Sequence, residues 1–171
     1  MGFRVLLTLI VALTLLLGAS PASTQAQDAT PEATLDLPAW VQTWIATQET
    51  EDIHAFTDLY THDATYEIIG DNVAVHDSLS IREVAGMSAA AVKDLDLVPT
   101  TFHAGEDWAV LEYTMSFSAM LAGGKPVRDV RVVTVFDLDD AGLITRSTDY
   151  FNDLAIQTQL GRMLVDSTPT P

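Results

Sequence analysis

The side chains that could do chemistry in this sequence are carboxylates, phenols and imidazoles, because the chain contains no cysteine. Without cysteine there is no thiol nucleophile, no disulfide, no iron–sulfur cluster and no cysteine-ligated zinc. The sequence also contains no glycine-rich phosphate loop, serine nucleophile elbow or dinucleotide fingerprint. The chemistry that remains open is acid–base catalysis by Asp, Glu, Tyr or His side chains.

Asp149 is the first candidate for that chemistry. Successive side chains of a strand point to opposite faces, so Asp149 shares one face with Ser147 and Phe151. If this face points inward, desolvation raises the pKa of the carboxyl group and makes it a better base. The alternative is an Asp that faces solvent near the end of a strand, and alternation alone does not decide between the two.

Tyr66 and His103 are two further candidates. A phenol such as that of Tyr66 can donate or accept a hydrogen bond from an otherwise apolar wall, although an ordinary half-buried strand aromatic explains it equally well. His103, near the end of a predicted strand, is a candidate acid–base partner for Asp149. The four histidines show no His-x-x-x-His spacing, so the sequence predicts no metal site.

The charge balance restricts the partners. The chain of 171 residues has 8 Lys and Arg against 24 Asp and Glu, a formal net charge of −16. Nucleic-acid backbones and anionic headgroups repel such a chain, so we expect neither nucleic acid nor, for the mature protein, a membrane as partner. The apolar fraction of 48% is too high for a disordered acidic tail, and the length suffices for one domain with a core.

Residues 1–26 are typical of a secretory signal peptide. Arg4 precedes an apolar run over residues 5–17, and Thr24-Gln25-Ala26 follows as a candidate cleavage site. The run is short for a membrane span, which needs about 20 apolar residues; an uncleaved N-terminal anchor is the alternative. No cysteine follows the run, which argues against a lipoprotein anchor. We therefore expect a secreted or extracytoplasmic protein, whose mature form has 7 basic and 24 acidic residues.

The rest of the chain divides into three predicted segments. Residues 27–37 are expected to form a flexible spacer, residues 38–164 the folded domain, and residues 165–171 a disordered tail. Within the domain, helical spacing of apolar residues predicts helices over residues 38–50, 51–60, 80–95 and 153–163.

Strand patterns occupy most of the second half of the domain. Alternation and β-branched composition predict strands over residues 64–69, 98–104, 108–121, 127–138 and 143–152. Gly123-Gly124 is placed to form the turn of a hairpin, where glycine accepts a positive φ. Helices that come first, followed by long antiparallel strands, indicate an α+β fold.

This order of elements resembles the nuclear transport factor 2-like superfamily, and its SnoaL-like branch in particular. The resemblance is carried by Ile53–Ile68 (IHAFTDLYTHDATYEI), by Val130–Asn152 after Gly124-Lys125, and by Gln159-Leu160-Gly161, and it covers residues 38–162. It implies a curved antiparallel sheet wrapped around N-terminal helices as a cone, with an apolar pocket at the open end. Members include polyketide cyclases, limonene-epoxide hydrolases, ketosteroid isomerases, dehydratases and non-catalytic binding proteins, so the fold alone does not decide the function.

The resemblance also implies roles for two residues. Asp149 matches the acidic catalytic residue on the last long strand of cyclases and epoxide hydrolases, and Tyr66 matches the tyrosine that helps to hold the catalytic water. The Arg and second Asp of the epoxide hydrolases align here with Thr114 and Ser116, and their Asn aligns with Ile68. With these three polar groups missing, the resemblance argues against epoxide hydrolysis by that mechanism.

The strand predicted over residues 108–121 has one polar and one apolar row. Its polar row is Glu112, Thr114, Ser116 and Ser118, and its apolar row is Leu111, Tyr113, Met115 and Phe117. Either row could line the pocket. If the apolar row packs inward, as in an ordinary half-buried sheet, the alignment of Thr114 and Ser116 with pocket positions is wrong by one residue.

Two hypotheses for the function stay open. The first is a cofactor-free acid–base enzyme of cyclase, isomerase or hydrolase type that acts on a small hydrophobic molecule, with Asp149 as base and Tyr66 orienting water or substrate. The second is a non-catalytic module of the same fold that binds a ligand or forms a homodimer through its sheet. Neither hypothesis calls for a cofactor or a metal.

Overall fold

The computed structural model describes residues 35–69 and 72–161. The predicted signal peptide (1–26), nearly all of the predicted spacer (27–37) and the predicted tail (165–171) lie outside the described residues. All elements named below belong to one compact unit, residues 34–171. Within the described ranges, no helix is both long and apolar enough to cross a membrane.

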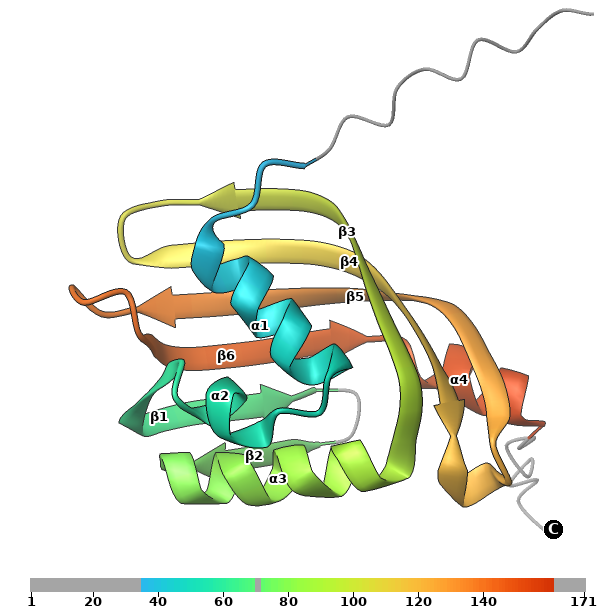
Figure 1. The fold of residues 1–171 in the computed structure, drawn as a ribbon. Helices are drawn as coiled ribbons and strands as arrows, with labels where there is room; N and C mark the ends of the chain where they lie inside the picture. Colours follow the sequence, from blue (N-terminus) through green and yellow to red (C-terminus); the bar gives the residue numbers. More distant parts are fainter. Residues whose placement is uncertain (1–34, 70–71, 162–171) are drawn as a thin grey trace, which may run out of the picture. The chain divides into compact units, whose positions relative to one another are not determined.

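Six strands form one curved, mixed sheet in the order β2-β1-β6-β5-β4-β3 (Figure 1). Their bounds are β1 Tyr60–Ile68, β2 Val73–His76, β3 Val92–Ala104, β4 Trp108–Ala119, β5 Lys125–Leu138 and β6 Ile144–Phe151. Neighbouring strands pair antiparallel, apart from β1 and β6, which run parallel. The predicted antiparallel sheet therefore holds for every pair but one, and the parallel pair joins the first and last long strands of the chain.

The helices are α1 (Ala39–Glu49), α2 (Ile53–Thr57), α3 (Ser78–Ala91) and α4 (Asp153–Leu160), with a short 3₁₀ turn, η1, at Met120–Ala122. Figure 1 shows α1 and α2 lying against one face of the sheet, α3 along the β1–β2 edge, and α4 directly after β6. This is the predicted α+β architecture, in which helices cover one face of a largely antiparallel sheet.

Several elements differ from those predicted. The helix expected over residues 51–60 is only α2, because Asp52 caps its start and Tyr60 already opens β1. The helix expected over residues 80–95 ends at Ala91, because Val92 adopts an extended conformation and begins β3. Strand β2, only four residues long, was not predicted; its hydrogen bonds go to β1, so its structure depends on a partner rather than on its own pattern.

The core lies between α1, α2 and the covered face of the sheet. Trp44 on α1 is almost fully buried and meets Phe136 on β5 edge to face, with ring centroids 5.2 Å apart. The same indole lies 6.0 Å from the ring of Tyr113 on β4 and 6.4 Å from that of Phe56 on α2. Because interiors pack to near-crystalline density, this aromatic cluster fixes the helices against the sheet. Two of its rings, those of Phe56 and Tyr113, also line the cavity described below.

Candidate functional site

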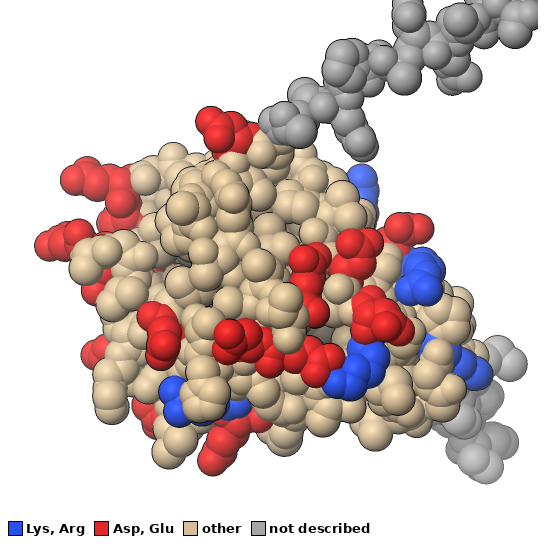
Figure 2. Space-filling view, viewed as in Figure 1, with Lys and Arg blue, Asp and Glu red and all other residues tan. Residues whose placement is uncertain are grey.

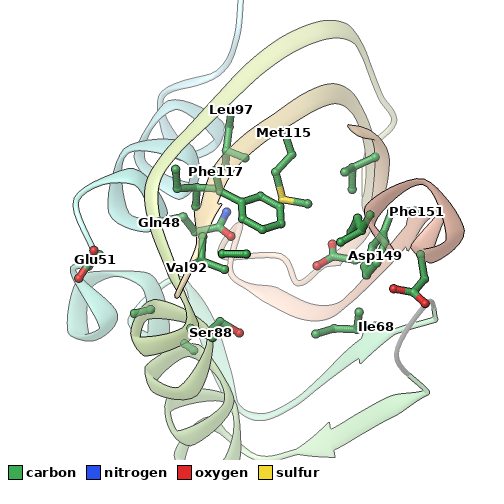
Figure 3. Close-up of a pocket in the computed structure, with 18 of the residues that line it drawn as sticks. Gln48, Glu51, Ile68, Ser88, Val92, Leu97, Met115, Phe117, Asp149 and Phe151 are labelled. Carbon is green, nitrogen blue, oxygen red and sulfur yellow. The ribbon is translucent and has the colours of Figure 1, made fainter. Parts of the chain in front are cut away.

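A cavity of about 400 Å³ lies against the covered face of the sheet (Figure 3). Its wall is mostly apolar, with side chains from all four helices, from η1 and from five of the strands, among them Phe56, Ile68, Leu97, Met115, Phe117 and Phe151. Volume and lining are those of a site for a small molecule. The apolar rows of the strands build this wall, because alternation sends every second side chain to the covered face.

Asp149 lies on the wall of this cavity. It is 7% exposed, and its β6 backbone pairs with Thr134 on β5 and Ile68 on β1. The Thr134 hydroxyl donates a hydrogen bond of 2.6 Å to Oδ1, and the Tyr66 hydroxyl donates one of 2.7 Å to Oδ2. Alternation did not decide which face of β6 points inward; in the structure it is the face that carries Asp149. The structure brings two of the three candidate residues, Asp149 and Tyr66, into direct contact.

Burial decides the electrostatics of this group. Desolvation raises the pKa of the Asp149 carboxyl above its ordinary value, and the hydrogen bonds from Thr134 and Tyr66 only partly oppose the shift. Burial, followed by the nearby Asp149 charge, raises the pKa values of Tyr66 and Tyr113 well above their ordinary value. No Lys, Arg or His is among the described residues that line the cavity. The site therefore holds a buried carboxyl group between neutral phenols.

A second layer of hydroxyl groups supports this carboxyl. The single hydroxyl proton of Thr134 is donated to Asp149, so in the 3.2 Å contact between Tyr113 and Thr134 the tyrosine must be the donor. Each carboxylate oxygen of Asp149 accepts one hydrogen bond, Oδ1 from Thr134 and Oδ2 from Tyr66. Sequence reasoning missed Thr134 and Tyr113. The available signal was the pair of strands predicted over residues 127–138 and 143–152, since the β5–β6 register places Thr134 directly opposite Asp149.

His103 does not reach this site. It is exposed near the end of β3, where it pairs with Val110, and it is not among the residues that line the cavity. The β3–β4 register shifts between Pro99 and Thr101, and beyond this irregularity Phe102 is the residue that packs inward. The expected partnership of His103 with Asp149 is therefore wrong.

The apolar row of β4 is the one that faces the cavity. Tyr113, Met115 and Phe117 line it, whereas Thr114 and Ser116 belong to the opposite face. The alignment of Thr114 and Ser116 with pocket positions is thus wrong by one residue, as the half-buried-sheet reading required. The correction supplies no cation, because the positions that do face the cavity hold a phenol, a thioether and a phenyl ring.

Metal ligands do not gather in the part of the chain that the structure describes. No group of three or more His, Asp or Glu side chains in residues 35–69 and 72–161 is arranged to hold a metal ion. The polar groups at the cavity are instead hydroxyls, carboxyls and the amides of Gln48 and Gln157. The hydroxyls and carboxyls can bind or exchange protons.

The sequence matches the model of one known protein family. The model of the SnoaL-like domain matches residues 41–147, which include β1 to β5 and the first part of β6. No curated protein sequence matches the chain.

Solved structures similar to this chain share its fold. One is a hypothetical protein with a ketosteroid isomerase-like fold from Catenulispora acidiphila, in complex with trimethylamine: TM-score 0.68, 19% identity, covering 74% of this chain and 95% of that one. A second is described as a SnoaL-like polyketide cyclase from Shewanella denitrificans: TM-score 0.64, 16% identity, 71% and 94% covered. A third is an LEH-like epoxide hydrolase from M. tuberculosis: TM-score 0.60, 22% identity, 74% and 90% covered. At these identities the similarity concerns the fold.

Proposed function

This chain belongs to the SnoaL-like domain family, and on that premise we propose that it binds a small apolar molecule in the cavity and acts on it by cofactor-free acid–base chemistry. The observation that carries the proposal is the Asp149 carboxyl on the cavity wall, buried, held by two hydroxyl donors and without a cation that would lower its pKa. A base with a raised pKa removes protons more effectively near neutral pH.

The proposed reaction moves one proton. The Asp149 carboxylate takes a proton from a substrate carbon next to a carbonyl group, or from a water molecule that attacks an epoxide, and returns it later in the cycle. Tyr66 and Thr134 each donate to one carboxylate oxygen, which fixes the orientation of the group and leaves further lone pairs free for the proton. The apolar wall keeps bulk water away from the reacting atoms.

Asp149→Asn tests the base, with Glu67→Gln as the matched control. Both variants replace a carboxyl by an amide on the same pair of strands, and only Asp149 lines the cavity. The purified full-length protein is assayed with three kinds of test substrate: small apolar ketones, enol-forming polyketide fragments and epoxides. We expect Asp149→Asn to lower kcat/KM by at least about 100-fold, the lower bound for loss of a general base, and Glu67→Gln to leave it within twofold. An unchanged rate in Asp149→Asn would refute the base.

A binding module is the second candidate, and one observation favours it. The cavity-facing positions of β1 and of the middle of β4 hold Tyr66, Ile68, Tyr113 and Met115, none of which carries a charge. Such a wall binds apolar molecules without activating them. Mass spectrometry of small molecules that co-purify with the protein distinguishes the candidates: a recovered compound that the protein retains unchanged through prolonged incubation supports binding.

Export and dimerisation are further parts of the proposal. The sequence of residues 1–26 supports secretion, and the mass of the protein recovered from the culture medium tests it, with cleavage after Ala26 as the expected result. A homodimer through the uncovered face of the sheet is tested by sedimentation of the mature protein, for which twice the monomer mass is expected.

A further inference from the structure

Every ionisable side chain that the described residues contribute to the cavity wall is an acid or a phenol. The carboxyls are Glu51, Asp149 and Asp153, and the phenols are those of Tyr66 and Tyr113. Glu51 is already neutralised, because its carboxylate forms an ion pair of 2.6 Å with Lys93. Asp153 accepts a 3.1 Å hydrogen bond from the amide of Gln157. Asp149 is the one carboxyl of this wall that is buried and receives only neutral donors.

Among residues 35–69 and 72–161, no Lys, Arg or His forms an ion pair or a hydrogen bond with Asp149. β1 presents Tyr66 and Tyr60, β4 presents Tyr113, and β5 presents Thr134, all of them neutral at physiological pH. The two ion pairs found within the described residues, Lys93–Glu51 and Arg146–Glu67, do not include it. A buried carboxylate without a counter-ion is destabilised, and a bound cation would relieve this.

The apolar part of the wall also suits a cation. Phe56, Phe117 and Phe151 line the cavity together with the two tyrosines. The faces of aromatic rings attract ammonium groups, most strongly once the cation is desolvated. Figure 2 shows that acidic side chains predominate on the surface in this view and gather beside a hollow in it. A negative surface attracts cations and repels anions before they enter.

We propose that the ligand of this cavity is an apolar amine in its protonated form, with the ammonium group paired to the Asp149 carboxylate and the hydrocarbon body against the aromatic wall. Carboxylates and phosphates are excluded. This inference rests on the proposed binding of an apolar molecule in the same cavity and names the class of that molecule. Because a paired ammonium group lowers the pKa of Asp149, the inference favours the binding role of the site over its role as a base. Where Asp149 is protonated in the empty cavity, binding of the ammonium ion releases that proton to solvent, so charge and protons balance.

Three probes with the same ring test the proposal: cyclohexylmethylamine, cyclohexylmethanol and cyclohexanecarboxylate, titrated calorimetrically into the full-length protein at pH 7. We expect the amine to bind at least about tenfold more tightly than the alcohol, and no binding of the carboxylate. Asp149→Asn should remove the preference for the amine while the alcohol still binds, and Glu67→Gln should preserve the preference. Equal affinity for amine and alcohol, absence of amine binding at millimolar concentration, or a preference that survives in Asp149→Asn would overturn the proposal.

The pH dependence gives a second test that needs no variant. Below the pKa of Asp149, release of one proton makes amine affinity rise with pH by up to about tenfold per unit, whereas alcohol affinity shows no such rise. An amine affinity that does not change with pH between 4 and 8 would contradict the ion pair. The outcome is separable from that of the proposed reaction. If the amine binds and no substrate is turned over, the role of Asp149 as a base is refuted and this inference stands. If neutral substrates are turned over and the amine is not preferred, this inference is refuted and the role as a base stands.

Discussion

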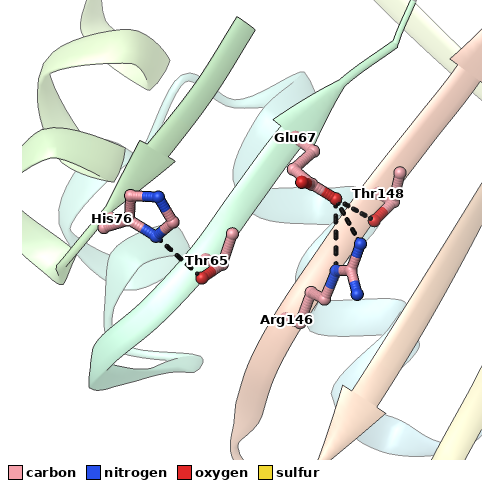
Figure 4. A network of polar contacts seen from close by, with 5 residues as sticks. All are labelled: Thr65, Glu67, His76, Arg146 and Thr148. Atoms are coloured by element: carbon pink, nitrogen blue, oxygen red, sulfur yellow. Dashed lines mark hydrogen bonds and ion pairs between the residues drawn. The ribbon is translucent and has the colours of Figure 1, made fainter.

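Two carboxyl groups on the same pair of strands have opposite surroundings. Asp149 on β6 points to the covered face and meets only hydroxyl donors. Glu67 on β1 points to the other face, where its Oε2 accepts hydrogen bonds of 2.6 and 3.1 Å from the Arg146 guanidinium and of 3.0 Å from Thr148 (Figure 4). Both acids lie on the paired strands β1 and β6. Burial nevertheless raises the pKa of Asp149, whereas the hydrogen bonds from Arg146 lower the pKa of Glu67.

The difference follows from the parity of one strand. Arg146 and Asp149 are three residues apart on β6, so pleat alternation sends the guanidinium to the outer face and the carboxyl to the inner one. The cation that could have neutralised Asp149 pairs with Glu67 instead. Water competes with the outer pair, which is exposed, whereas the inner carboxyl depends on every protein donor that it has. Substitutions on the two faces should therefore differ in the size of their effect on the free energy of unfolding and in the sign of its pH dependence.

The largest difference is expected between two isosteric changes, Thr134→Val and Thr148→Val. Thr134 is fully buried, donates to Asp149 and accepts from Tyr113, so its loss leaves a buried carboxylate oxygen and a buried phenol without a partner. We expect Thr134→Val to lower the free energy of unfolding by about 3 kcal/mol at pH 7. Thr148→Val should lower it by less than about 1 kcal/mol, because Glu67 keeps Arg146 and water. Urea unfolding of both variants measures this, and equal losses would show that the faces do not differ.

A smaller effect is expected from Tyr66→Phe, with Tyr150→Phe as its control. The phenylalanine keeps the ring in place but removes the donor to Asp149 Oδ2, which costs about 2 kcal/mol for a buried charged acceptor. Tyr150 lies on the outer face of β6 and is 46% exposed, so its hydroxyl is replaced by water at little cost. Loss of the donor should also raise the pKa of Asp149 further, which carbon-13 NMR of the labelled carboxyl would detect. A pKa that falls in Tyr66→Phe would contradict the assigned direction of this hydrogen bond.

Parity also explains how much of the site the sequence could predict. Alternation placed Asp149 with Ser147 and Phe151 on one face and left open which face is inside; that depends on packing against α1 and α2, which strand periodicity does not contain. Tyr66 was found through resemblance, since its contact with Asp149 joins residues 83 positions apart. Thr134 could be found only by pairing the strands predicted over residues 127–138 and 143–152 in the correct register. His103 was misplaced because a single irregularity in β3 reverses which residues face inward.

The fold shows the same division between local and long-range information. The hairpin at Gly123-Gly124 was predicted because both glycines adopt positive φ, a local requirement that sequence expresses directly. The parallel pairing of β1 with β6 and the short strand β2 were not predicted, because each depends on a distant or separate segment that supplies the hydrogen bonds. Helix ends near Val92 and Tyr60 were wrong because the sheet recruits those residues as strand.

The two carboxyls should change stability with pH in opposite directions. The folded-state pKa of Asp149 is raised, so its contribution to stability is complete below the unfolded pKa of about 3.9 and is lost as the pH rises through the folded value. The folded-state pKa of Glu67 is lowered, so its contribution is present above about 4.3 and is lost as the pH falls through the folded value. Compared with the wild type, Asp149→Asn should gain stability as the pH rises above about 4, whereas Glu67→Gln should lose stability as the pH rises toward about 4.3 and stay level above it. Urea unfolding between pH 3 and 8 measures both slopes, and slopes of the same sign would refute the contrast.

The smallest effect should come from Arg146→Met, which removes the cation of the outer pair and keeps the aliphatic stem. The guanidinium is half exposed, so the ion pair is screened and contributes little to the free energy of unfolding. We expect a loss smaller than that in any inner-face variant, and no measurable difference from the wild type in 1 M NaCl, where the screening length falls to about 3 Å. The pKa of Glu67 should return toward its ordinary value, because the largest cause of its shift is gone. A salt-independent loss of unfolding free energy as large as that of Tyr66→Phe would show that the Arg146–Glu67 pair stabilises the fold as much as a hydrogen bond to the buried carboxyl does. The proposed difference between the two faces of the sheet would then be wrong.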